Sequence, residues 1–137
     1  MSPQAIASSL ESLRNAGSVF GLILAKGQEV IFGDTSLTPE GVQELAITLD
    51  DIAYYFTQEK RNPDQLAFGF DGGSLLILLA DEYRLVVFHY DSNELDFVAK
   101  AGRAFLKDYL TGLRITEWVA GAGNAPQDER PVALSAG

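Results

Sequence analysis

Three short apolar segments joined by tight turns constrain the fold of this chain more than any other feature. Residues 65–70, 74–80 and 84–90 are rich in Leu, Ile, Val and Phe, and only Asp-Gly-Gly at 71–73 and Asp-Glu-Tyr at 81–83 separate them. Connections this short join antiparallel neighbours, because a parallel pair needs a crossover of about a dozen residues or more. The pattern therefore predicts a three-stranded antiparallel meander.

A second pair of strands is predicted nearer the N-terminus. Residues 18–25 are apolar on both faces, residues 29–33 form a second short segment, and Lys-Gly-Gln at 26–28 places a glycine in the turn between them. This arrangement is typical of a hairpin. The expected number of strands is then five.

The longest predicted helix lies between the two groups of strands. Thr38 is a suitable N-cap, Pro39 suits the first helical position, and the Asn-Pro pair at 62–63 ends the helix. Apolar residues recur at helical spacing on one face, at Val42, Leu45, Ala46, Leu49, Ile52, Ala53 and Phe56.

Two further helices are expected at the ends of the chain. Residues 4–16 carry one apolar face and are followed by Gly17, as a C-terminal cap would be. The last helix starts near residues 92–93, where Asn93 and Asp96 loosely match a capping box, and its apolar stripe runs to Leu113.

The elements give the order α-β-β-α-β-β-β-α, which predicts one α+β domain on a five-stranded antiparallel sheet. A chain of 137 residues is long enough for one such core. After Trp118 the composition changes to Ala, Gly, Pro and acidic residues. We therefore assign residues 1–118 to the domain and predict that residues 119–137 form a flexible C-terminal tail.

The charge disfavours two classes of partner. The formal net charge is −9, which opposes binding to nucleic acid and to anionic membrane surfaces. Residues 97–114 are an exception, since this stretch contains four basic residues, Lys100, Arg103, Lys107 and Arg114, and only one acidic residue, Asp108. This basic stretch either favours solubility and the helix dipole or steers a partner electrostatically. The longest apolar run, residues 75–80, is too short to span a bilayer, and we expect a cytoplasmic protein.

The residues offer little for catalysis or cofactor binding. There is no cysteine, and His89, the single histidine, lies on a predicted strand with no paired acid evident. The chain contains neither a nucleophile-elbow motif nor a phosphate-binding loop motif. The glycines near residues 69–73 join two strands rather than open a helix, so they indicate a turn. We predict a protein without catalytic activity, metal or cofactor.

The sheet has more two-sided apolar surface than three helices can cover. Five strands span about 24 Å, and a helix is about 10 Å across, so two helices nearly cover one face and the third leaves much of the other open. We predict a homodimer through the long helix and the strand at 65–70, with interface residues Ile47, Asp51, Tyr54, Tyr55, Gln58, Leu66, Phe68 and Phe70. Alternatively, Tyr54 and Tyr55 are surface aromatics without a partner.

Four segments together match the pattern of a known family. They are Gly-Leu-Ile-Leu-Ala at 21–25, the long helix from Thr38, Phe-Gly-Phe-Asp-Gly-Gly-Ser-Leu-Leu-Ile at 68–77, and the strand and helix that run from Leu-Val-Val-Phe at 85–88 to Phe-Leu-Lys-Asp-Tyr-Leu at 105–110. With the element order, they resemble the roadblock / dynein light chain family, whose bacterial members are predicted regulators of Ras-like GTPases. The likeness covers roughly residues 4–114.

The resemblance implies a profilin-like architecture with strand order 2-1-5-4-3, the first and last helices on one face and the long helix on the other. It also implies dimers through the long helix and the third strand. Such dimers bind small GTPases or act as scaffolds beside them. We therefore predict a non-catalytic, homodimeric regulator or scaffold for a Ras-like small GTPase.

Two other functions stay open at this point. One is a ligand-sensing module of profilin or PAS type, which needs a cavity between sheet and helix that the large side chains Phe20, Phe32, Phe68, Phe88 and Phe105 could instead fill. The other is a structural subunit of a larger assembly.

Overall fold

The structure, a computed structural model, describes residues 3–124 and, among these, the side chains of residues 6–113. The elements follow the predicted order: α1 (Pro3–Arg14), β1 (Val19–Lys26), β2 (Glu29–Asp34), α2 (Pro39–Gln58), β3 (Gln65–Phe70), β4 (Gly73–Ala80), β5 (Tyr83–His89), a short 3₁₀ turn η1 (Ser92–Glu94) and α3 (Leu95–Asn124). No helix in this part of the chain is long and apolar enough to cross a lipid bilayer.

The five strands form one antiparallel sheet in the order β2-β1-β5-β4-β3. The first strand and the last lie at its centre, where Leu22 pairs with Val87 and Leu24 with Leu85. The β1–β2 hairpin and the β3–β4–β5 meander are therefore joined through a pairing between distant parts of the sequence. The fold class and strand order expected from the sequence are confirmed.

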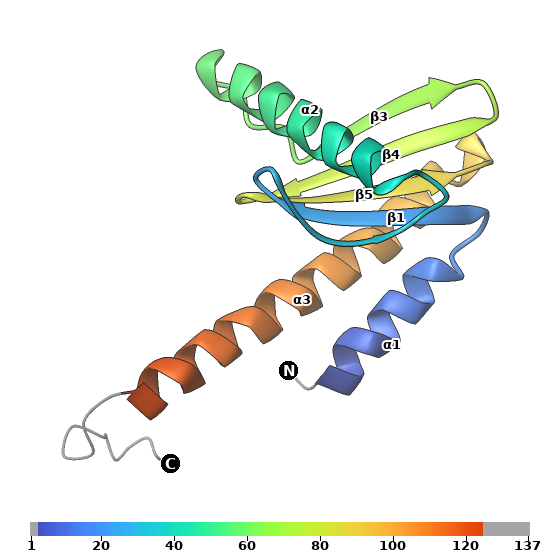
Figure 1. The fold of residues 1–137 in the computed structure, drawn as a ribbon. Helices are drawn as coiled ribbons and strands as arrows, with labels where there is room; N and C mark the ends of the chain where they lie inside the picture. The colour runs from blue at the N-terminus through green and yellow to red at the C-terminus, as the bar shows by residue number, and fades with distance from the viewer. Residues whose placement is uncertain (1–2, 125–137) are drawn as a thin grey trace.

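Helices cover the sheet unequally (Figure 1). Helices α1 and α3 pack on one face, against a core that includes Leu76 and Leu78 of β4. Helix α2 crosses the other face alone and packs on a smaller core that includes Ile77. Side chains of β4 alternate between the two cores, as the period of a strand requires. The sequence argument for a lone α2 helix is confirmed.

Helix α3 approaches the sheet closely at Gly102. A Cβ atom at this position would lie 2.7 Å from Cδ1 of Leu78 on β4 and 3.5 Å from Cδ2 of Leu85 on β5. A glycine is therefore required there, and its position places α3 above β4 and β5.

The two long helices begin differently. Thr38 caps α2 as predicted, since its hydroxyl accepts a hydrogen bond of 3.0 Å from the Gly41 amide, and Pro39 opens the helix. Before α3, by contrast, Asp91 is the residue whose carboxylate accepts from the Asn93 amide, at 2.9 Å. The prediction that Asn93 is the cap was wrong, because the η1 turn moves the start of α3 to Leu95.

Helix α3 continues to Asn124, past the position where the sequence composition changes. Residues 119–124 are helical, although they belong to the predicted tail, and residues 125–137 lie outside the described residues. The domain boundary at residue 118 stays a prediction.

Candidate protein-interaction surface

The two edge strands of the sheet differ in charge. Strand β2 has Glu29 at one end and Asp34 at the other, whereas β3 has the sequence Gln-Leu-Ala-Phe-Gly-Phe, with no charged residue. Antiparallel pairing of β2 with a second β2 in full register would place Glu29 opposite Asp34, and such charges discourage pairing between edges. The uncharged edge β3 has no such protection.

The side chains of β3 point alternately to the two faces of the sheet. On the α2 face, Phe68 and Phe70 each keep 47% of their surface exposed, whereas Leu66 is partly buried and packs into the α2 core. Ala67 and Gly69 alternate with them and so lie on the α3 face, where a Cβ at Gly69 would meet nothing within 4 Å. Of the three β3 residues predicted for the interface, only the two phenylalanines present a large free surface.

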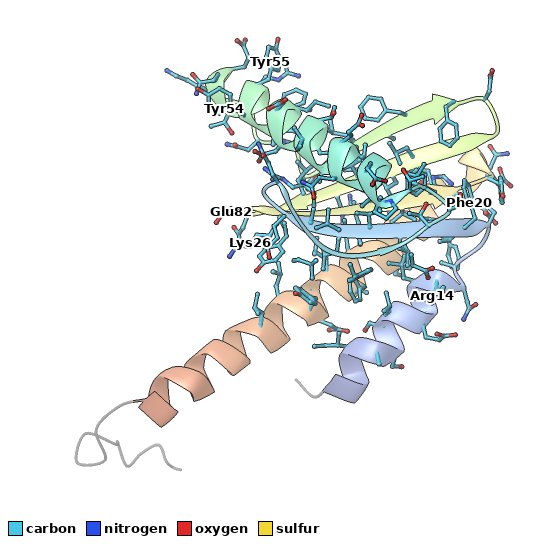
Figure 2. All side chains as sticks on the ribbon, in the orientation of Figure 1. Arg14, Phe20, Lys26, Tyr54, Tyr55 and Glu82 are labelled. Carbon is cyan, nitrogen blue, oxygen red and sulfur yellow. The ribbon has the colours of Figure 1, made fainter. Side chains whose placement is uncertain are left out.

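The five α2 residues predicted for the interface fall into two groups. At 100° per residue, Ile47, Asp51, Tyr54 and Gln58 lie opposite the apolar stripe, on the outer side of the helix. The flank that carries Gln43 and Asp50 faces the β1–β2 turn, because both side chains bond to Gln28 in that turn. Tyr55 lies on the other flank, towards β3. Tyr54 and Tyr55, 66% and 57% exposed, stand at the C-terminal end of α2 (Figure 2).

A group of five aromatic residues lies on the α2 face at the other end of the sheet, and we name it the aromatic patch: Phe20, Phe68, Phe70, Phe88 and Tyr90. The Phe20 ring stacks on Tyr90 with centroids 4.0 Å apart and meets Phe88 at 5.9 Å. A Cβ at Gly73 would touch Phe70 at 3.1 Å and Phe20 at 3.4 Å, so this glycine leaves room for both rings.

The sequence pattern does not predict three members of the aromatic patch. It indicates Phe20 and Phe88 as possible core residues and gives no role to Tyr90. Their proximity depends on the pairing of β1 with β5, which places Gly21 opposite Phe88. Tyr90 is 62% and Phe20 37% exposed. An alternation of apolar residues gives no sign of which strand ends a helix will leave uncovered.

One buried ion pair ties α2 to the sheet. Arg84 of β5 is 7% exposed, and its Nη1 donates to Oδ1 of Asp50 at 2.8 Å. Beside this pair, a cavity of about 360 Å³ opens between the end of α2 and the turn before β5, with Arg61, Asp64 and Asp81 also on its walls. The patch and the cavity lie at opposite ends of α2's face.

The described residues show no arrangement suited to catalysis by the single histidine. His89 has no exposed surface, and its Nδ1 lies 3.1 Å from the Asp91 carbonyl oxygen. Residues 6–113 contain no group of three or more His, Cys, Asp or Glu side chains placed to hold a metal ion. The surface that stands out is therefore apolar and aromatic.

No protein-family model matches the sequence, and a search of curated proteins finds no significant relative. Solved structures do match. MglB of Myxococcus xanthus aligns with a TM-score of 0.65 at 15% identity, over 85% of this chain and 99% of that one. The Roadblock/LC7 domain from Streptomyces avermitilis aligns with a TM-score of 0.56 at 13% identity, over 74% and 93%.

A third structure extends the comparison. The gliding protein MglB from Thermus thermophilus aligns with a TM-score of 0.56 at 16% identity, over 74% of this chain and 83% of that one. At such low identity the likeness concerns the fold. It agrees with the strand order and with the placement of the three helices described above. The chain has the Roadblock/LC7 fold.

Proposed function

We propose that this chain is a homodimeric, non-catalytic regulator or scaffold for a Ras-like small GTPase. The observation that carries the proposal is the uncharged edge β3 beside an α2 face that one helix cannot cover. A second copy would pair with the edge strand and cover the exposed face, because its β3 continues the sheet and its α2 covers more of the open face. The Ras-like GTPase as partner follows from the resemblance to the roadblock / dynein light chain family, and the Roadblock/LC7 fold of the chain agrees with that resemblance.

The positions of the aromatic side chains fit a twofold axis that is perpendicular to the sheet and passes beside the middle of β3, between this strand and the β3 of a second copy. Tyr54 and Tyr55 lie at one end of the α2 face, and Phe20 marks the other end (Figure 2). A rotation about that axis exchanges the two ends. It brings the C-terminal end of each α2 towards Phe68 and Phe70 of the other copy, and Tyr55 lies on the flank that faces this contact.

Phe20 and Tyr90 remain open in such a dimer. Phe20 lies on β1, three strands away from β3, and Tyr90 follows β5, two strands away from β3. Both residues are therefore roughly 10–15 Å from the edge strand. Exposed aromatic clusters of this kind mark protein-binding sites. We assign the GTPase contact to these two residues and place the complex in the cytoplasm.

The test separates the dimer from the GTPase contact. Sedimentation velocity on the purified chain at micromolar concentration should give a dimer of the 14.8 kDa protomer. The same protein should retain a small GTPase from its genome in one nucleotide state, GTP or GDP, in a pull-down. Phe20→Ser should abolish retention of the GTPase and leave the dimer intact. Phe97→Ser, which changes an exposed side chain of α3, should affect neither retention nor the dimer. A monomer, or equal retention of both nucleotide states, would contradict the proposal.

A ligand-sensing role has one observation in its favour, the polar cavity of about 360 Å³ beside Arg84. The core itself is well filled, since Phe105 is 1% exposed and Phe32 and Phe88 are partly buried. Sensing would therefore use the end of α2 rather than a central chamber. A dimer that binds no GTPase, but is stabilised by a small polar molecule, would favour this second function.

A further inference from the structure

The α3 face of the dimer has an opening of its own. Helix α3 packs on β4 and β5, and on this side it reaches β3 through the Arg103 side chain, which bonds to Gln65 at the start of the strand. Beyond Gln65, the β3 residues that project to this face are small, Ala67 and Gly69, and a Cβ at Gly69 would meet nothing within 4 Å. Pairing of two β3 strands would therefore join two bare strips into one floor.

The width of this opening follows from the spacing of strands. A twofold axis between two β3 strands lies about 7 Å from β4 and about 10 Å from the line midway between β4 and β5. The two α3 axes are then roughly 14–19 Å apart. Packed helices lie 8–10 Å apart, so the two α3 helices are too distant to touch, and the gap accepts one additional helix.

Cations line the wall that α3 presents to this gap. The Arg103 guanidinium donates a hydrogen bond to the amide oxygen of Gln65 on β3, which shows that this side of α3 faces the edge strand. Lys100 and Lys107 are three residues before and four after Arg103 and share its face. Neither ion pair found among the described side chains involves these cations, although the chain carries 19 acidic residues against 10 basic ones.

Apolar hollows interrupt the charged wall. A cavity of about 370 Å³ lies between α3 and β4, lined by Leu78, Leu106 and Leu110, with Lys107 and Arg103 also on its walls. A smaller cavity of about 160 Å³ lies at the other end of β3, beside Gly69 and Leu95. Acidic groups are few, with Asp64 on the wall of the larger cavity and Asp96 in the first turn of α3.

We propose that the groove between the two α3 helices of the dimer binds one acidic amphipathic helix of a partner protein. The inference rests on the proposed dimer, since a single chain has only one wall. Apolar side chains of the helix enter the hollows, and its carboxylates meet Lys100, Arg103 and Lys107 from both copies. Helices bound in grooves combine these two contacts. Nucleic acid and anionic lipid fit less well, because the remaining surface is acidic.

The residues that line the groove set the length of the bound helix. From Leu95 at one hollow to Leu110 at the other, α3 rises about 22 Å, so a matching helix needs about 15 residues. Since the groove lies on the twofold axis, two chains form one site. The expected stoichiometry is therefore one helix per dimer.

The test uses two stapled helical peptides of about 15 residues that share one leucine face. One carries Glu beside that face and the other carries Lys at the same positions. After sedimentation has established the dimer, calorimetry should find one acidic peptide per dimer and no binding of the basic one. Lys100→Glu with Lys107→Glu should weaken binding about tenfold or more, because four charges per site change sign. Lys26→Glu, at the end of β1 and three strands away from β3, should leave it unchanged.

Several results would overturn this proposal. If the chain is monomeric, the groove does not form, and the proposed function fails with it. A confirmed dimer that ignores the acidic peptide, binds one peptide per chain, or binds both peptides equally would refute the groove alone. Charge-reversal-sensitive binding of an oligonucleotide or of phosphatidylserine vesicles, without peptide binding, would assign the groove to another class of partner.

Discussion

Replacement of Phe68 by serine should weaken the dimer with little change to the fold of each chain. Phe68 lies on the edge strand with 47% of its surface exposed, so a large part of the ring is free for contact with a second copy. A phenylalanine offers roughly 200 Å² to burial, and the exposed part is therefore about 95 Å². At 25 cal/mol per Å², its burial in the dimer contributes about 2.4 kcal/mol per chain.

Both copies lose this contact in the variant, which would cost about 5 kcal/mol if all the exposed area were buried. Ordering of side chains at the interface lowers that figure, and we expect a loss of about 2–5 kcal/mol. The dimer dissociation constant should rise by between about thirtyfold and several thousandfold. The half of the ring that is already buried makes a separate contribution to the stability of each chain.

Sedimentation equilibrium over a range of loading concentrations measures the dissociation constant directly, and circular dichroism reports whether the chain is folded. Phe97→Ser is the matched control, because Phe97 is 59% exposed and lies on α3, on the other face of the sheet. The reasoning is refuted if Phe68→Ser leaves the dissociation constant unchanged, or if Phe97→Ser raises it as much.

Three further predictions concern stability and are measured by denaturant unfolding. Asp50→Ala should lower the free energy of unfolding by about 1–3 kcal/mol, because it leaves Arg84 buried without its partner. This loss is smaller than the loss from breaking a fully buried ion pair, since Asp50 is 32% exposed, and an unchanged unfolding midpoint would contradict the prediction. Gly102→Val should cost about 2 kcal/mol or more because its Cβ would overlap a buried leucine of β4, whereas Gly69→Ala should stay within about 0.5 kcal/mol. Burial, and to a smaller extent the nearby Tyr83 of β5, raises the pKa of Tyr109. The free energy of unfolding should therefore fall as the pH rises from 10 through that raised pKa, and Tyr109→Phe should make this alkaline decline shallower.

Much of the fold was predictable because its signals are local. The turns at 71–73 and 81–83 fix antiparallel neighbours, and Thr38 with Pro39 fixes the start of α2. Such signals depend on a few adjacent residues. The strand order depends on the pairing of β1 with β5, which no adjacent residues specify, and it came from the resemblance to a family.

The interaction surface was predictable only in part. Helical spacing correctly placed Tyr54 and Tyr55 outside the apolar stripe, and both are exposed. Strand alternation could not separate Leu66 from Phe68, since both point to the α2 face and only the path of α2 across the sheet decides which one is covered. The same limit hid Tyr90, because its neighbour Phe20 comes from the other end of the sequence.

Single cysteines along β3 test most directly whether two copies pair through this edge. The chain contains no cysteine, so one introduced at each of residues 65–70 in turn is the only thiol present. Residues opposite one another in an antiparallel pair have Cβ atoms about 5 Å apart, close enough for a disulfide at or beside the twofold axis. Under mild oxidation, dimer cross-linking should peak at one position near the middle of β3 and fall on both sides, whereas a cysteine at Ile31 on β2 should not cross-link. A chain that sediments as a dimer but cross-links at no position in β3 would contradict the account.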